Sequence, residues 1–163
     1  MQYFDYYSSP LGILMVTEEN GAITGLELSE KNSKPAKRSI DSSEQKNTPL
    51  TALAKSQLEE YFQGARKTFT LPLQPAGTPF QRKVWDALCT IPYGETRSYK
   101  EIALQIQNPR GCRAVGMANH RNPIMIVIPC HRVIGSSGAL VGYAGGLDIK
   151  EWLLRHEKNI LNN

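Results

Sequence analysis

The residues of this chain with the most obvious chemistry stand together at Cys130, His131 and Arg132. A thiol beside a potential base and a fixed positive charge can ionise near neutral pH, and the thiolate is the nucleophilic form of cysteine. An isolated cysteine more often packs in a protein core. Here the neighbouring imidazole and guanidinium favour a nucleophile over a packing residue.

An apolar run at 124–128 leads into this cluster through Pro129. Its unbroken apolar character predicts a buried strand. Neighbouring side chains on a strand point to opposite faces, so Cys130 and His131 cannot share a proton directly if the strand continues through them. Either the chain turns at Cys130 or a water molecule bridges the two side chains, and the sequence leaves both possibilities open. Glu157 lies far along the chain but could orient His131 in space.

Composition limits the possible classes of protein. The chain has 163 residues, of which 40% are hydrophobic, so it can bury a core as one domain or as a catalytic domain with a small companion. Its apolar runs are too short to span a membrane, and residues 1–5 lack the features of a signal peptide. Three widely spaced cysteines favour neither a disulfide framework nor a zinc site. We therefore expect a cytoplasmic monomer with reduced thiols, no membrane partner, no cofactor and no metal.

The net charge of +4 is unevenly distributed along the chain. Residues 1–78 hold eight Lys or Arg against nine Asp or Glu, whereas residues 79–163 hold eleven against six. Six of the basic residues fall within 97–132, where Glu101 is the one acid. A basic stripe around a reactive thiol suggests a polyanionic partner, although an ordinary solvated face can have the same count.

The first half of the chain has the pattern of a scaffold. Strand-like segments at 3–8, 12–17 and 22–28, separated by turn residues, predict a small antiparallel sheet. The polar stretch 29–48 predicts a loop or mobile linker. A helix is expected to start after Thr48 and to end at Gly64. Its predicted buried face consists of Leu50, Leu53, Ala54, Leu58 and Phe62.

The second half is predicted to be mostly helical. Thr78 and Gln81 form a capping box for a helix through Cys89, which we expect to pack inward. Asp148 is expected to cap a final helix that ends near Glu157. That helix should bury Leu147, Trp152 and Leu153.

Two short helices between these elements predict a helix-turn-helix. Ser98 and Glu101 form a second capping box, and a break at 108–110 separates this helix from another over about 111–119. The second helix is rich in Gly and Ala, so its backbone can approach another surface closely, and arginines flank it. Nucleic acid and a neighbouring helix of the same protein are equally good candidates for that surface.

Seven stretches of the second half are together typical of one family. They are GTPFQ (77–81), IPYGET (91–96), RAVG (113–116), NP (122–123), IPCHRV (128–133), GYAGG (142–146) and KEWLL (150–154). In this set and order the chain resembles the methylated-DNA–protein-cysteine methyltransferases, that is, the O6-alkylguanine-DNA alkyltransferases. The stretches cover nearly all of 77–157, and the first half fits the family's less distinctive domain.

The resemblance implies an α+β protein of two domains. Residues 1–76 would form a small N-terminal domain of antiparallel sheet and helix. Residues 77–163 would form a mostly helical domain with a winged helix-turn-helix-like DNA-binding motif and the alkyl acceptor. Some members of the family bind zinc in the N-terminal domain, but no Cys or His precedes Cys89 here, so we predict no metal.

The resemblance also implies an irreversible, single-turnover repair reaction on double-stranded DNA. Cys130 would take a methyl or other alkyl group from the O6 position of guanine, and from the O4 position of thymine, after the nucleotide is flipped out of the duplex. His131 would deprotonate Cys130 through a water molecule, and Glu157 would orient His131. Asn122 would link the recognition helix to the active site.

Further roles that the resemblance implies concern DNA and the base. Arg113 would enter the duplex in place of the flipped nucleotide, and Tyr99 would push the target phosphate and donate a hydrogen bond to the base. Ala114 and Gly116 would lie on the helix that enters the minor groove. The base pocket would be lined by Val133, Tyr143 and Ala144. Ala144 replaces a serine found in some members, which removes a side-chain contact but keeps the backbone amide.

Three other functions are rivals to this interpretation. A relative that binds alkylguanine DNA without repairing it would lack the acceptor cysteine, but Cys130 is present. A Cys–His–Glu hydrolase would need an oxyanion hole and would leave the small-sided basic helix unexplained. A sequence-specific regulator would bind an operator tightly and would not need Cys130.

Overall fold

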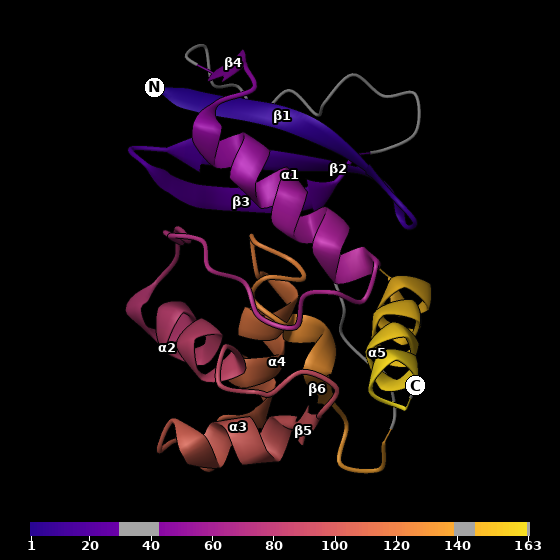
Figure 1. The fold of residues 1–163 in the computed structure, drawn as a ribbon. Coiled ribbons are helices and arrows are strands. Elements are labelled where there is room, and N and C mark those ends of the chain that lie inside the picture. The colour runs from indigo at the N-terminus through magenta and orange to yellow at the C-terminus, as the bar shows by residue number, and fades with distance from the viewer. Residues whose placement is uncertain (30–42, 139–145, 163) are drawn as a thin grey trace. The chain divides into compact units, whose positions relative to one another are not determined.

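The computed structural model describes residues 1–29, 43–138 and 146–162. The chain is an α+β protein that divides into two compact units, Met1–Pro75 and Ala76–Asn163 (Figure 1). The first unit consists of a sheet with one helix, and the second is mostly helical. Within the described ranges, no helix is both long enough and apolar enough to cross a lipid bilayer.

Three consecutive strands build most of the sheet in the first unit. They are β1 (Gln2–Ser9), β2 (Gly12–Glu19) and β3 (Ala22–Leu28). Each pairs antiparallel with its neighbour in sequence, which confirms the predicted sheet. Between β2 and β3, Asn20 and Gly21 have φ angles of 53° and 78°. Two left-handed residues in succession are what a two-residue hairpin turn requires.

A fourth strand lies within the stretch that the sequence predicts as a loop. This strand, β4 (Ser43–Gln45), pairs in parallel with β1, so the sheet order is β3-β2-β1-β4. The prediction is therefore wrong for these three residues. All three are polar and exposed, so they carry no alternation that could have indicated a strand.

One helix, α1 (Pro49–Phe62), belongs to the first unit, and it begins after Thr48 as predicted. Its buried face differs from the predicted one, because Leu53 is 45% exposed. The face consists instead of Thr51, Ala54, Gln57, Leu58 and Tyr61. Thr51 and Gln57 can be buried because hydrogen bonds to Thr48 and Thr70 satisfy them, and an apolar pattern cannot reveal such positions.

The second unit contains four α-helices, one 3₁₀ turn and a pair of very short strands in the described residues. The elements are α2 (Pro79–Leu88), β5 (Arg97–Ser98), α3 (Tyr99–Gln105), α4 (Cys112–His120), η1 (Cys130–Arg132), β6 (Val133–Ile134) and α5 (Leu147–Leu161). β5 and β6 pair in parallel. Both predicted capping boxes of this half are present, at the start of α2 and of α3.

Helices α3 and α4 form the predicted helix-turn-helix, and α2 packs against α4 (Figure 1). Between α3 and α4, Gln107 adopts a φ of 61°, which lets the chain reverse before α4. The Trp85 side chain is 2% exposed, and its Nε1 donates a 2.8 Å hydrogen bond to the Ala118 carbonyl. This contact holds the inner side of α4 against α2.

Four expectations for residues at or near the ends of helices are wrong. Cys89 is the C-cap of α2 and is exposed, not packed inward. The N-cap of α5 is Gly146, and Asp148 lies in the first turn instead. Its negative charge there still interacts favourably with the helix dipole. Leu147 is 50% exposed, and α5 continues past Glu157 to Leu161. Local patterns locate helix ends poorly, because tertiary contacts decide how far the last turn persists.

Candidate active site

The chain turns at Cys130. The apolar run 124–128 is not a continuous strand: Ile124 makes an isolated β-bridge, residues 125–127 form a turn with Ile126 at a φ of 72°, and the chain then enters the 3₁₀ turn η1. Four of its five residues are buried, which explains the apolar sequence, because burial alone does not distinguish a strand from packed turns. Successive side chains on a 3₁₀ turn are about 120° apart instead of on opposite faces. Cys130, which is 2% exposed, and His131 therefore need not point in opposite directions.

A buried carboxylate, Glu157 on α5, holds the turn in place. His131 Nε2 lies 2.7 Å from Glu157 Oε2. Arg132 donates from Nε and Nη2 to the two Glu157 oxygens at 2.9 and 3.0 Å, and the Gly94 amide donates at 3.1 Å. Burial alone would raise the pKa of Glu157, but the hydrogen bonds of His131 and Arg132, together with the charge of Arg132, hold that pKa well below its usual range. Glu157 is therefore ionised and accepts all four hydrogen bonds.

This network determines which nitrogen of His131 carries the proton. Burial lowers the pKa of His131, against the opposing effect of Glu157, so the imidazole is neutral at pH 7. An ionised carboxylate only accepts hydrogen bonds, so His131 Nε2 must be the donor and Nδ1 must hold the lone pair. Nδ1 is buried and has no hydrogen-bond partner within the described residues. A neutral, oriented imidazole with an available Nδ1 can accept a proton.

Two asparagines connect the end of α4 to the region of Cys130. Asn122 donates from Nδ2 to the Ile128 carbonyl at 2.8 Å and accepts from the Ile124 amide at 3.0 Å. Asn119, which is fully buried, donates from Nδ2 to the Cys130 carbonyl at 3.3 Å. The turns before Cys130 are therefore held by side chains from the C-terminal part of the helix-turn-helix.

Lys150 places a second cation close to the turn. Its side chain is fully buried, its Nζ donates to the Val133 carbonyl, and Nζ lies 5.8 Å from the centroid of the Tyr99 ring. Burial lowers the pKa of Lys150 to about 8, against the opposing effect of Cys130. Reciprocally, a charged Lys150 favours the thiolate form of Cys130.

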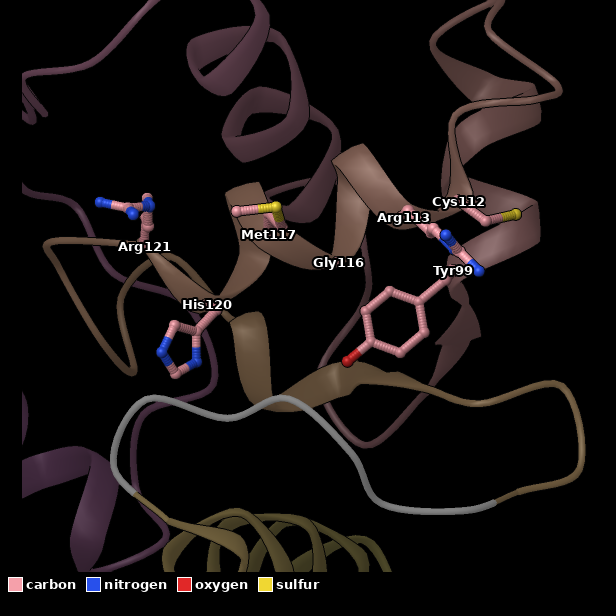
Figure 2. A pocket seen from close by; sticks show the side chains of 7 residues that line it. All are labelled: Tyr99, Cys112, Arg113, Gly116, Met117, His120 and Arg121. Carbon is pink, nitrogen blue, oxygen red and sulfur yellow. The ribbon is translucent and has the colours of Figure 1, made fainter.

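The outer side of α4 borders a groove of about 550 Å³. It is lined by Cys112, Arg113, Gly116, Met117, His120 and Arg121 along α4 and by Tyr99 from the start of α3, as Figure 2 shows. Arg113 and Ala114 are exposed. A Cβ added to Gly116 would meet only the Tyr99 ring, at 3.8 Å, which is an ordinary contact. Packing within the protein therefore does not require glycine at this position.

The predicted site residues thus fall into three groups. Cys130, His131 and Glu157 come together, with Asn122 and Val133 close by through the backbone of the same turns. Arg113, Gly116 and Tyr99 line the groove on α4, and Ala114 is exposed on the same helix. Tyr143 and Ala144 lie outside the described residues.

The sequence did not single out three residues of this site. The sequence pattern presents Arg132 only as a charge beside the thiol and Lys150 only as part of the KEWLL stretch, and it does not distinguish Asn119. A charged residue inside an apolar helical face, such as Lys150, is a usable signal, because burying a charge is costly. Asn119 carries no such signal. Within the described ranges, no three His, Cys, Asp or Glu side chains cluster in a way that could hold a metal ion.

Comparison with known proteins covers both units. Residues 79–159 match the family described as "6-O-methylguanine DNA methyltransferase, DNA binding domain", and residues 2–75 match its "ribonuclease-like domain". The chain is 52% identical over 159 residues to the constitutive methylated-DNA–protein-cysteine methyltransferase of Bacillus subtilis, covering 97% of this chain and 96% of that protein. It is also 52% identical to the corresponding Methanosarcina barkeri protein, covering 98% and 99%.

A solved structure agrees with these matches. The crystal structure of Mycobacterium tuberculosis OGT in complex with DNA is similar to this chain with a TM-score of 0.86 and 44% identity, covering 97% of this chain and 94% of that one. Similarity of this extent, together with the arrangement of Cys130, His131 and Glu157, establishes that the chain belongs to the 6-O-methylguanine DNA methyltransferase family.

Proposed function

We propose that this protein repairs DNA by moving a methyl or other alkyl group from the O6 position of guanine, and from the O4 position of thymine, to its own Cys130. Membership of the family and its DNA-bound relative support this function. The single observation that carries it is the turn at Cys130, where a buried neutral imidazole has its Nδ1 available and its Nε2 held by an ionised Glu157. We assign this chemistry to residues 77–163 and a supporting role to residues 1–76.

The transfer needs a thiolate, a base and a leaving group. His131 Nδ1 takes the thiol proton through a water molecule, and Glu157 stabilises the imidazolium that forms. The Cys130 sulfur then attacks the alkyl carbon, so that a carbon–sulfur bond forms while the bond between carbon and O6 breaks. The proton that left the thiol ends on the restored guanine, which stays in the DNA, so the reaction is balanced. Because the thioether is not readily hydrolysed, each molecule reacts once.

Access to the base requires extrusion from the duplex, which costs about a few kcal/mol for unstacking and unpairing. We infer that α4 enters the minor groove, where its small side chains Ala114 and Gly116 allow close approach. Arg113 is exposed on this helix and can fill the space of the flipped nucleotide. Tyr99 lines the same groove, where its hydroxyl can donate to the base. A lesion can lie in any sequence, so binding should depend on phosphate and shape contacts.

The pocket for the extruded base would combine the Val133 backbone with Tyr143 and Ala144. Asn122 would hold the turns before Cys130 at a fixed distance from α4, since it bonds to both Ile128 and Ile124. We also propose, as the sequence suggests, that the protein acts in the cytoplasm.

Intact-protein mass spectrometry tests this function directly. After incubation with duplex DNA that contains O6-methylguanine, the protein should gain the mass of one methylene, with a one-to-one endpoint and the methyl on Cys130. Cys130→Ser should bind the same DNA but gain no mass. Product formation far beyond the protein concentration would identify a hydrolase instead, and transfer by Cys130→Ser would move the nucleophile elsewhere.

A further inference from the structure

Asn119 is a fully buried amide in α4. Figure 2 shows the groove that borders this helix. Asn119 lies in the last turn, three residues after Gly116. Residues three apart on a helix are neighbours, so Asn119 lies beside Gly116, where the groove side of α4 meets its buried side. The Tyr99 ring lies close to this boundary, because a Cβ on Gly116 would stand 3.8 Å from Tyr99 Cε1.

The Asn119 side chain has two hydrogen-bond partners in residues to which we assign a role in the reaction. Its Nδ2 donates to the carbonyl of Cys130 at 3.3 Å, and its side chain hydrogen-bonds to the phenol of Tyr99. Burial and the charge of Cys130 raise the pKa of Tyr99, whereas the bond from Asn119 acts in the opposite direction. That direction is the one expected when an amide N–H donates to the phenolic oxygen.

The oxygen of the Asn119 amide, in contrast to its nitrogen, does not bond to either of these groups. Asn119 Oδ1 is buried and has no hydrogen-bond partner within the described residues. An unsatisfied buried carbonyl is costly, and an apolar residue of similar size would avoid that cost. An amide at this position is therefore explained by what its nitrogen does and not by packing.

We propose that Asn119 is a positioning residue that aims the Tyr99 hydroxyl at the extruded base and makes it a stronger hydrogen-bond donor. This inference rests on the proposed function. A hydroxyl whose oxygen accepts a hydrogen bond donates a stronger one, because the two bonds polarise each other. The base gains negative charge as its bond to the alkyl carbon breaks, so a donor beside it stabilises the transition state more than the bound substrate.

A double-mutant cycle tests whether Asn119 acts through Tyr99. The single-turnover rate of methyl transfer from duplex DNA is measured for wild type, Asn119→Leu, Tyr99→Phe and the double variant. We expect Asn119→Leu to slow transfer about tenfold in the wild-type background, the size of one buried hydrogen bond. In the Tyr99→Phe background it should slow transfer less than about twofold. Equal slowing in both backgrounds would overturn the proposal, because Asn119 would then act through Cys130 or through packing.

Titration of Tyr99, followed by NMR of its ring carbon, provides a measurement that does not depend on activity. Asn119→Leu should raise the pKa of Tyr99 further, and Asn119→Asp should do the same, since a carboxylate accepts from a phenol instead of donating to it. Asn119→Asp has nearly the shape of asparagine and serves if the leucine variant does not fold. An unchanged pKa of Tyr99 in the folded variants would also overturn the proposal.

Gln57→Leu is the matched control for loss of a buried amide. Gln57 is 2% exposed in α1 and bonds to Thr70 through both ends of its amide. This variant should lower thermal stability and leave the transfer rate unchanged. Wild type must take up one methyl under the same conditions. If it does not, the proposed function fails, whereas an active wild type with an additive cycle counts against Asn119 alone.

Discussion

Replacing Glu157 by glutamine removes one negative charge from the network of four hydrogen bonds while keeping the shape of the side chain. The change affects both neighbours. Arg132 is 7% exposed and would be left as a buried cation without its carboxylate, a situation that costs about 3–5 kcal/mol of stability. His131 would lose the charged acceptor that stabilises its imidazolium form, because the glutamine amide has one neutral acceptor oxygen and an NH₂ group in place of the second.

The magnitude for catalysis follows from the bond between His131 and Glu157. A hydrogen bond to a charged group contributes about 1.5–3 kcal/mol. Because each 1.36 kcal/mol corresponds to a tenfold change in rate, Glu157→Gln should slow methyl transfer by roughly 10- to 150-fold. The DNA-binding affinity should change little, because Glu157 is fully buried.

The assays separate stability from rate. Both tryptophans of the chain, Trp85 and Trp152, belong to the second unit, so urea unfolding followed by tryptophan fluorescence reports on that unit alone. Single-turnover transfer to Cys130 is then measured well below the urea midpoint. The matched control is Glu151→Gln on the same helix, which breaks an exposed pair with Arg155 that contributes about 0.3–0.5 kcal/mol. If Glu157→Gln changed stability and rate no more than this control, the role of the network would be refuted.

Three further predictions concern the groove and the second cation. Arg113→Ala should slow repair in duplex DNA more than reaction with a free alkylguanine base, measured beside Arg155→Ala; equal losses on both substrates would exclude insertion into the duplex. Gly116→Ala should stabilise the second unit by about 0.5–1 kcal/mol, because alanine favours a helix and its Cβ meets only the Tyr99 ring, yet it should weaken DNA binding in a fluorescence titration. Unchanged affinity would show that α4 does not approach DNA closely. Finally, Lys150 has an ordinary pKa of 10.5 and a folded pKa of about 8, so the unfolded chain binds more protons in that window and stability should rise with pH. Lys150→Met should remove this rise in urea unfolding between pH 8 and 10, and a rise of equal size in the variant would contradict the reasoning.

Local signals predicted most of the secondary structure. Thr78 and Ser98 each satisfy backbone groups of the helix they precede, so the start of a helix depends on a few adjacent residues. The hairpin turn at Asn20 and Gly21 likewise depends on adjacent residues, because both residues of the turn must adopt a positive φ. These elements were predictable since their causes lie within a few positions.

The run at 124–128 shows where such signals fail. Most of its apolar residues are buried, as those of a strand would be, but the segment turns back on itself and Asn122 hydrogen-bonds to both of its ends. The apolar sequence therefore predicted that the segment is buried, but it could not predict the backbone conformation, because a buried strand and a buried turn have the same composition.

By itself, the sequence determined which residues have reactive chemistry: a thiol, an imidazole and a carboxylate, in an order and spacing typical of one family. The tertiary structure decided how they work together. Glu157 reaches His131 and Arg132 across 26 and 25 positions, and Asn119 reaches Cys130 across 11, so each contact exists only once the helices have packed. The reason is physical. The proton on His131 and the charge on Glu157 depend on burial and on partners, which are properties of the folded chain and not of any residue alone.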